Sequence, residues 1–371
     1  MAKEIPEKVK NQRAMIAEKV ISDMETLGVR WMKPWAPAAR PYNAISGKAY
    51  SGSNSFNLAV VAGINGYTDP RWMTFNQIRQ AGLHLKPDQH ATVVERWCRY
   101  VFGDDGETYR TERDEQGNDV LNMPEGTKVK GSFLAYQGYF NVFNGDQIEG
   151  MEPLESLEAA RELTPERIGA IADRLIAGSA LAGIPVMEAA SDRAYFSPSA
   201  MRIVVPSRTQ FENPQEFCST LLHEMGHSTG PALGRDLTGR FGSESYAREE
   251  LVAEMSSIFS AADLGVAYDR GSEAQAQDCY ENNIAYLKSW VRAIQDDPNV
   301  LWNAAAQAGR AADAVVERYE RAPEPGREQP EAALEVEAAV GDLDALEADA
   351  MDGVRLQVEA AGARDQVERA I

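Results

Sequence analysis

Cysteine and histidine are scarce in this chain of 371 residues, which contains three cysteines and four histidines. The cysteines, at positions 98, 218 and 279, are odd in number and far apart, which predicts free thiols in a reducing compartment rather than a disulfide framework or a cysteine-based zinc site. The sequence also lacks an apolar run of the ~18 residues that span a membrane, and its first residues lack the apolar stretch of a secretory signal. We therefore expect a cytoplasmic protein with no membrane partner.

Positive charge is also in short supply, because the formal net charge is -20. This excess of acid argues against a protein whose whole surface coats nucleic acid. The charge is uneven, however: residues 1–100 hold 14 Lys/Arg and 8 Asp/Glu, residues 101–150 hold 4 and 10, and residues 322–371 hold 4 and 13. The first hundred residues therefore offer one candidate anion-binding patch, although a chance asymmetry would give the same counts.

Residues 1–150 are predicted to form an α+β domain. Apolar residues at helical spacing predict helices over 5–29 and 71–82. β-branched and aromatic residues predict strands over 91–102 and 133–143. A polar stretch with glycine turns separates these two strands and indicates an exposed loop or hairpin.

Residues 151–321 are predicted to form a second, mainly helical domain. One short strand is expected at 202–206. Helical patterns cover most of the remainder, at residues 151–190, 214–228, 246–263, 273–296 and 300–320. From residue 322 the composition changes to a Pro- and Glu-rich linker followed by Ala, Glu and Asp, so residues 322–371 are predicted to be an acidic, disordered tail.

A candidate metal site lies in the segment NPQEFCSTLLHEMGH. Asn213 suits the cap of a helix and Pro214 its first position, so a helix should begin there. His223 and His227 are four residues apart, which places both rings on one helix face, one turn apart, where a single zinc ion can take both. Glu224 lies close to that metal without being a ligand, as in the H-E-x-x-H motif, whose glutamate takes a proton from zinc-bound water. The alternative is a pair of core or surface histidines on a helix.

A catalytic zinc ion needs a third protein ligand and an open position for water. Cys279 is remote, whereas the next predicted helix carries Glu249, Glu250 and Glu254. We predict that Glu250 is the third ligand and that Glu254 hydrogen-bonds the far nitrogen of a ligand histidine. Glu249 is the competing ligand, and a solvated acidic helix face is the alternative to both. In this hypothesis the cofactor is one Zn²⁺ ion, and Glu224 acts as general base and then as general acid.

Further motifs accompany this site, namely AYFSPSAMRIVVP, Arg235-Asp236, YAREELVAEMSS and YLKSWVRAIQDDPNVLWNAAAQAGRAADAV. With them, residues 194–316 resemble the zincin-like metallopeptidase domain of the ArdC-type antirestriction proteins of plasmids and phages. The resemblance implies that the two histidines and a glutamate of the second helix are metal ligands. These roles fall on His223, His227 and, by position, Glu250.

Residues 8–150 resemble the N-terminal single-stranded-DNA-binding domain of the same family. The resemblance rests on five segments, at residues 41–43, 46–48, 50–54, 71–77 and 139–144. The chain departs from the family pattern at Lys86-Pro87-Asp88, where a Lys-Gly turn is usual, and at Met201, where an acidic residue is frequent.

Basic and aromatic residues are interleaved in this N-terminal region, as in proteins that bind single strands through phosphates and stacked bases. The alternative is that the aromatic residues are core and the charges are scattered. The residues predicted to contact single-stranded DNA are Arg40, Tyr42, Asn43, Lys48, Tyr50, Asn54, Arg71, Trp72 and Lys86.

The resemblance implies an antirestriction protein of a mobile element or phage that binds single-stranded DNA and carries a zinc-dependent peptidase site. A host restriction component is the implied protein substrate. Two alternatives remain open. The first is a zinc metallopeptidase whose N-terminal domain only positions a protein substrate, and the second is a purely structural zinc ion that ties two helices together.

Overall fold

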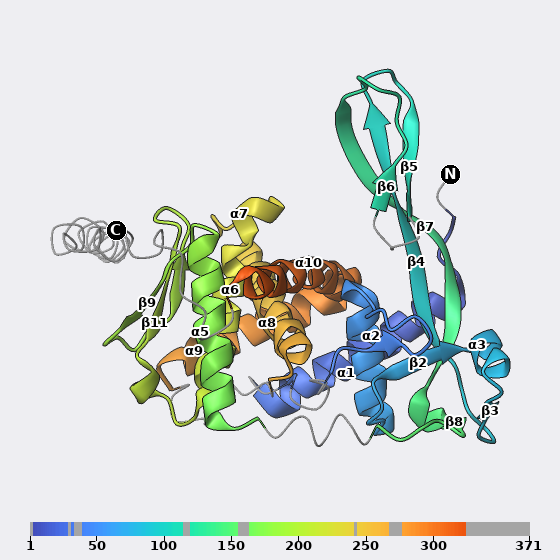
Figure 1. The fold of residues 1–371 in the computed structure, drawn as a ribbon, viewed down its shortest axis with the longest axis horizontal. Helices are drawn as coiled ribbons and strands as arrows, with labels where there is room; N and C mark the ends of the chain where they lie inside the picture. The colour runs from blue at the N-terminus through green and yellow to red at the C-terminus, as the bar shows by residue number, and fades with distance from the viewer. Residues whose placement is uncertain are drawn as a thin grey trace, which may run out of the picture. The chain divides into compact units, whose positions relative to one another are not determined.

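A computed structural model describes residues 3–28, 31–32, 39–113, 119–154, 163–240, 243–266 and 277–323. Figure 1 shows strands concentrated in the first part of this chain and helices in the second, so the expected α+β class is confirmed. Among the helices that the structure describes, none combines the length and the apolar character required to cross a membrane.

The first half is organised around one sheet, whose described strands run in the order β1-β2-β7-β4-β5-β6. Their bounds are β1 Tyr42–Asn43, β2 Arg71–Thr74, β4 Thr92–Gly103, β5 Thr108–Arg113, β6 Asp119–Leu121 and β7 Val129–Asn144. Strands β1 and β2 are parallel, and the other neighbouring pairs are antiparallel. The outer parts of β4 and β7 extend beyond the helices together with β5 and β6 (Figure 1). We call this extension, residues 96–136, the arm.

Two helices cover the base of this sheet, α1 (Glu7–Leu27) and α2 (Gly52–Asn65). The side chains of Gln12 on α1 and Asn57 on α2 both donate to the backbone oxygen of Val93, at 2.9 and 2.7 Å. Smaller elements follow β2 and β7 in the chain, namely α3 (Phe75–Gln80) and β3 (His84–Leu85) after β2, and η3 (Gly145–Gln147) and β8 (Ile148–Glu149) after β7. The hydrogen bonds from Gln12 and Asn57 to Val93 fix the two helices to β4, the strand that leads into the arm.

The second half is mainly helical, with a small sheet in the order β10-β11-β9. Its elements are α5 Pro165–Leu181, β9 Val186–Ala189, β10 Tyr195–Ser197, β11 Arg202–Pro206, η4 Arg208–Gln210, α6 Pro214–Ser228, α7 Gly230–Leu233, α8 Glu244–Leu264, α9 Gln277–Asp296 and α10 Asn299–Arg321. Helix α6 packs against α5 and α8, and α8 packs against α10. The helix that carries both candidate histidines is therefore held inside the layer of helices.

The two halves share one apolar core. Buried side chains of α1, α2 and the sheet form a single cluster with those of α8, α9 and α10. The rings of Phe56 and Trp302 meet edge-on with centroids 6.0 Å apart, and α2 and α10 approach so closely that a Cβ on Gly309 would lie 2.6 Å from the Cα of Gly52. Residues 1–322 accordingly form one compact unit.

Several sequence expectations differ from the structure in detail. The segment 71–82 was expected to be helical throughout, but residues 71–74 pair with β1 and β7 as strand β2, and the helix begins only at Phe75. Thr74 supplies the cap, because its hydroxyl accepts from the Gln77 amide. Part of the expected helical stretch 151–190 is strand β9. From residue 324 onward the predicted acidic tail lies outside the described residues.

Candidate metal centre

Helix α6 begins where its sequence predicts. The Asn213 side chain accepts a hydrogen bond from the Glu216 amide at 2.8 Å, and Pro214 occupies the first helical position. The Glu216 carboxylate accepts in return from the Glu212 amide at 3.0 Å. This cap fixes the start of the helix, and therefore the direction in which His223 and His227 project.

Helices α6 and α8 approach each other over small residues. A Cβ added to Gly226 would meet the Ser256 hydroxyl and would lie 3.4 Å from the Cα of Ala253. Because glycine lets the two backbones come this close, carboxylates on α8 reach the imidazoles on α6. Ser243 caps α8 by accepting from the Tyr246 amide at 3.2 Å, which sets the rotation of the acidic face.

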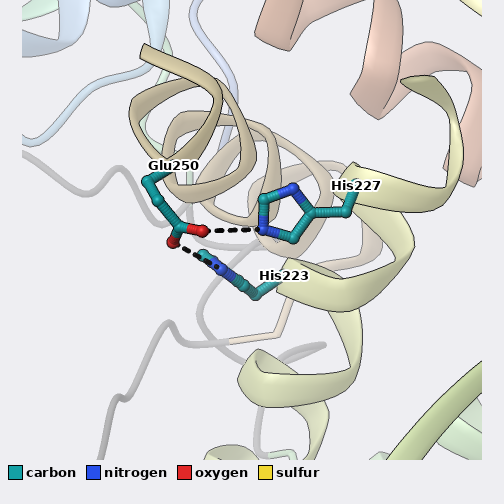
Figure 2. Close-up of side chains that lie close together, drawn as sticks. All are labelled: His223, His227 and Glu250. Carbon is teal, nitrogen blue, oxygen red and sulfur yellow. Dashed lines mark ion pairs between the residues drawn. The ribbon is translucent and has the colours of Figure 1, made fainter. Parts of the chain in front are cut away.

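Three side chains from these helices converge on one point (Figure 2). The Nε2 atom of His223 lies 3.5 Å from one oxygen of Glu250, and the Nε2 atom of His227 lies 3.5 Å from the other. The three candidate ligand atoms all lie within 4.8 Å of one another. Bonds of about 2.1 Å in a tetrahedral arrangement separate neighbouring ligand atoms by about 3.4 Å, so these spacings fit a zinc-sized ion.

Two further carboxylates hold the imidazoles from behind. The Nδ1 atom of His223 lies 3.2 Å from Glu254, and the Nδ1 atom of His227 lies 3.1 Å from Glu249. In each ring an Nδ1–H donated to a carboxylate leaves Nε2 as the atom that faces Glu250, which is the tautomer a metal requires. The structure thus places Glu254 beside Nδ1 of His223 and Glu249 beside Nδ1 of His227, whereas Glu250 reaches the shared point.

Arg235 is a part of the site to which no role was assigned from the sequence. Its Nη2 atom lies 3.1 Å from Glu249 and donates to the backbone oxygen of Gly226 at 2.6 Å. Its side chain is only 4% exposed, so this ion pair is shielded from water. Arg235 therefore fixes Glu249, which in turn fixes the ring of His227. The available signal was the Arg235-Asp236 pair shortly after the histidines.

The electrostatics of the site favour a bound cation. Burial alone would lower the pKa of His227, but hydrogen bonds to Glu249 and Glu250 outweigh burial and raise it to about 10. Burial would likewise raise the pKa of Glu250, yet its contacts with His223 and His227 bring it well below its ordinary value. Three carboxylates, those of Glu249, Glu250 and Glu254, thus contact two imidazoles. A bound dication can supply the positive charge that a proton on the imidazoles otherwise provides.

Glu224 is buried beside these residues, at 7% exposure, and is not one of the three converging ligands. Its charge contributes to the raised pKa of His227, which places its carboxylate in the electrostatic environment of the site. A buried carboxylate next to a metal-held water is suited to accept a proton from it.

The residues predicted to bind DNA do not form one exposed surface. Trp72 is fully buried in the shared core, and Arg40 is only 8% exposed. The Arg40 guanidinium contacts Asp263 at 3.0 Å and Asp313 at 2.9 Å, so it ties the first half of the chain to α8 and α10. An aromatic or basic residue in the sequence does not reveal whether tertiary packing covers it.

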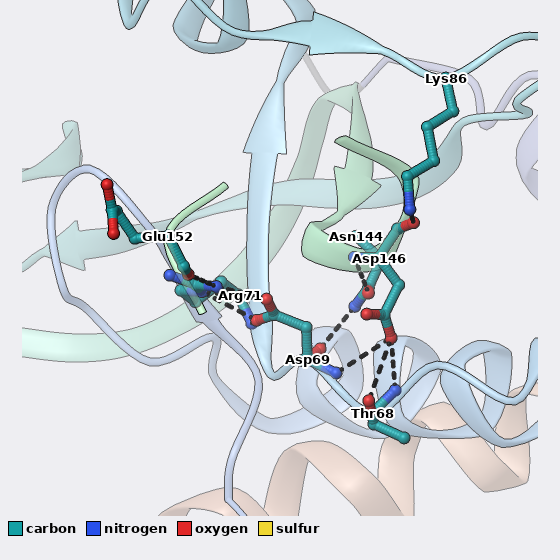
Figure 3. Close-up of polar contacts among 7 residues, drawn as sticks. All are labelled: Thr68, Asp69, Arg71, Lys86, Asn144, Asp146 and Glu152. Atoms are coloured by element: carbon teal, nitrogen blue, oxygen red, sulfur yellow. Dashed lines mark hydrogen bonds and ion pairs between the residues drawn. The ribbon is translucent and has the colours of Figure 1, made fainter. Parts of the chain in front are cut away.

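Two other predicted contacts, Arg71 and Lys86, are engaged by the protein itself (Figure 3). Arg71 pairs with Asp69 at 2.6 Å and donates to the backbone oxygen of Glu152 at 2.8 Å. The Lys86 amine donates to the backbone oxygen of Asp146 at 2.7 Å, although this lysine is exposed. Both side chains therefore stabilise the loops around β2 and η3.

The remaining predicted contacts have mixed surroundings. Asn43 accepts hydrogen bonds from the amides of residues 45 and 46 and is bonded to Gln77, so it shapes a turn. Asn54 exchanges two hydrogen bonds of 2.8 Å with the backbone of Glu95. Tyr50 packs against the shared core, Tyr42 is half-buried and Lys48 is exposed. Most of this set therefore has a structural role.

Comparison with known proteins finds two matching families and two similar solved structures. Residues 10–143 match the N-terminal domain of the anti-restriction factor ArdC, and residues 172–307 match a zincin-like metallopeptidase family. Two solved structures of the antirestriction protein ArdC from plasmid R388, one metal-free and one with Mn(II) bound, are each 25% identical to this chain. They cover 84% and 83% of it and 98% of their own length, with TM-scores of 0.56 and 0.55.

Relatives at the sequence level are also found. Two DNA primases TraC of Escherichia coli are 34% identical over 311 and 310 residues, which is 81% of this chain. The chain spans only 20% and 26% of their length. The uncharacterized protein y4eC of Sinorhizobium fredii is 28% identical over 304 residues, covering 80% of this chain and 89% of that protein.

The fold and the paired histidines on α6 define a protein with a zincin-like metallopeptidase domain. The region that precedes it matches the N-terminal domain of the anti-restriction factor ArdC. The chain is thus similar to the ArdC-type antirestriction proteins in both of its matched regions and in fold.

Proposed function

We propose that this protein protects incoming DNA from host restriction as a cytoplasmic protein that binds single-stranded DNA and holds one catalytic Zn²⁺ ion. The convergence of His223, His227 and Glu250, with Glu249 and Glu254 behind the two rings, carries the metal part of the proposal. The match of residues 10–143 to the N-terminal domain of ArdC supports the DNA part. A host restriction component is the proposed protein substrate.

The donor set favours a catalytic ion over a structural one. Structural zinc sites are closed by four protein ligands, whereas catalytic sites have three and leave a position for water. Within the part of the chain that the structure describes, the converging group has three members. The imidazoles and carboxylate are also the ligand types that zinc takes in hydrolytic sites.

The chemistry follows from the chain's own residues. When bound, the ion supplies Lewis acidity and lowers the pKa of its water toward about 7. Glu224 then takes a proton from the attacking water and returns it to the leaving amine. Glu249 and Glu254 keep both imidazoles in the ligating tautomer throughout, and Arg235 keeps Glu249 in place.

Metal analysis of the purified full chain tests the proposal directly. We expect about one zinc per chain in the wild type, strong loss of zinc in His223→Ala and Glu250→Ala, and retained zinc without hydrolysis of unfolded casein in Glu224→Gln. A chain that binds no divalent metal would refute the metal site. A zinc-loaded Glu224→Gln chain with full hydrolytic activity would refute the role of Glu224.

A further inference from the structure

The arm exposes a column of aromatic rings. Tyr100 and Phe133 stack across strands β4 and β7 with ring centroids 5.3 Å apart and planes 17° apart, and Phe102 stacks on Phe133 at 5.2 Å and 28°. Phe102 and Phe133 are 44% and 40% exposed. The arm extends beyond the helices (Figure 1), and large apolar side chains left open on such an element indicate a binding surface.

Arginine side chains lie on the same face of the arm as this column. The register pairs Tyr100 with Phe133 and with Arg110, and alternate residues of a strand share one face, so Arg96, Tyr100 and Phe102 lie together with Arg110 beside them. Arg110 donates to the sulfur of Cys98 at 3.4 Å, which confirms that it leans over this face. Both arginines are exposed.

Acidic residues limit where a polyanion can pass. Asp104, Asp105 and Glu107 lie at the turn between β4 and β5, beyond the last ring of the column. Glu112 lies on β5 two residues after Arg110 and shares its face. A phosphate backbone would therefore run along the column between Arg96 and Arg110, short of the acidic turn.

We propose that this face of the arm, formed by Tyr100, Phe102, Phe133, Arg96 and Arg110, is a contact surface for single-stranded nucleic acid. Unpaired bases stack on aromatic rings and arginines neutralise the phosphates between them, a combination that needs no base-specific hydrogen bonds. The inference rests on the single-strand binding in the proposed function and assigns it to residues different from those in the sequence prediction. Arginines beside the rings favour nucleic acid over a protein partner.

Binding of a labelled oligothymidine of about 15 nucleotides to the full chain tests this surface, with fluorescence anisotropy measured over a salt series. We expect Phe133→Ala to weaken binding about 5- to 150-fold, since it removes the central ring of the column. We expect Phe133→Trp to keep binding because it preserves a stacking surface. Arg110→Gln should make the negative slope of log affinity against log salt less steep by about 0.7, the value for one phosphate contact with a single strand.

Two variants serve as controls. Phe75→Ala removes a phenylalanine of similar exposure, 50%, from α3 and should leave affinity unchanged. Glu112→Gln removes the carboxylate beside Arg110 and should strengthen binding. If Phe133→Ala does not fold, Arg110→Gln and Glu112→Gln still test the surface with opposite expected signs.

The outcomes separate the two levels of the argument. A wild-type chain that binds no oligothymidine at low salt would refute the single-strand binding of the proposed function. A wild-type chain that binds, together with unchanged affinity in Phe133→Ala and an unchanged salt slope in Arg110→Gln, would overturn this inference alone.

Discussion

The two carboxylates behind the histidines should contribute unequally to metal affinity. Glu254 contacts the Nδ1 atom of His223 at 3.2 Å with a side chain 4% exposed. Glu249 contacts His227 at 3.1 Å with a side chain 11% exposed, but it shares its charge with Arg235 at the same distance. Loss of an outer carboxylate of this kind typically costs 10- to 100-fold in metal affinity, or about 1.4 to 2.7 kcal/mol.

The expected effects follow from this difference. Glu254→Gln should fall near the 100-fold end of the range, because its carboxylate is the more deeply buried of the two and contacts directly the histidine that it orients. Glu249→Gln should fall near the 10-fold end, because Arg235 already neutralises part of that charge. The two carboxylates act on different rings, so the double variant should lose about 1000-fold if the effects add.

The assay is competition for zinc between the purified full chain and a chromophoric chelator at fixed pH. Glu244→Gln is the matched control, because Glu244 lies on the same helix but pairs with Arg248 at the surface, with its side chain 65% exposed. The reasoning would be refuted by equal losses in all three single variants, or by a larger loss in Glu249→Gln than in Glu254→Gln.

Two further predictions concern stability. Burial raises the pKa of Asp263 from its ordinary value of 3.8 to about 6; the charge of Arg40 lowers this pKa and the charge of Asp313 raises it. Between these two pH values the folded chain therefore holds a proton on Asp263 that the unfolded chain has released. The contribution of this carboxyl group to stability should therefore fall by up to about 3 kcal/mol as pH rises from about 4 to 7, and Asp263→Asn should be more stable than wild type at pH 8 and equal to it near pH 4 in urea unfolding. Gly309→Ala should destabilise the chain by about 1 to 3 kcal/mol, since the new Cβ meets the Gly52 backbone, whereas Gly169→Ala on α5, with open space around it, should stabilise by about 0.5 to 1 kcal/mol. Equal unfolding midpoints in these two glycine variants would contradict the packing account.

Local sequence signals predicted the helix that carries the candidate site. Asn213 and Pro214 mark its start, and the four-residue spacing of His223 and His227 determines their common face. The choice between Glu249 and Glu250 could not be made in the same way. Adjacent residues of a helix point about 100° apart, and only the position of α6 against α8 decides which carboxylate reaches the metal point.

Tertiary packing also determines which of the predicted DNA contacts are exposed. Arg40 and Trp72 are residue types that are typical of a nucleic-acid surface, but long-range contacts bury both. Arg40 lies between two aspartates, and Trp72 lies in the shared core. The column on the arm depends on register, since Tyr100 and Phe133 are distant in sequence and meet only when β4 pairs with β7. No periodicity within either strand indicates that pairing.

The close seam between α2 and α10 has a practical consequence for dissecting this protein. A chain cut at residue 150 would remove the contact of Phe56 with Trp302 and would expose the apolar side of α2 to water. It would also leave Arg40 without Asp263 and Asp313. Such a fragment would tend to aggregate for reasons unrelated to nucleic acid, and its behaviour would say little about the intact molecule. Single substitutions in the whole chain are the sounder way to assign each activity to its half.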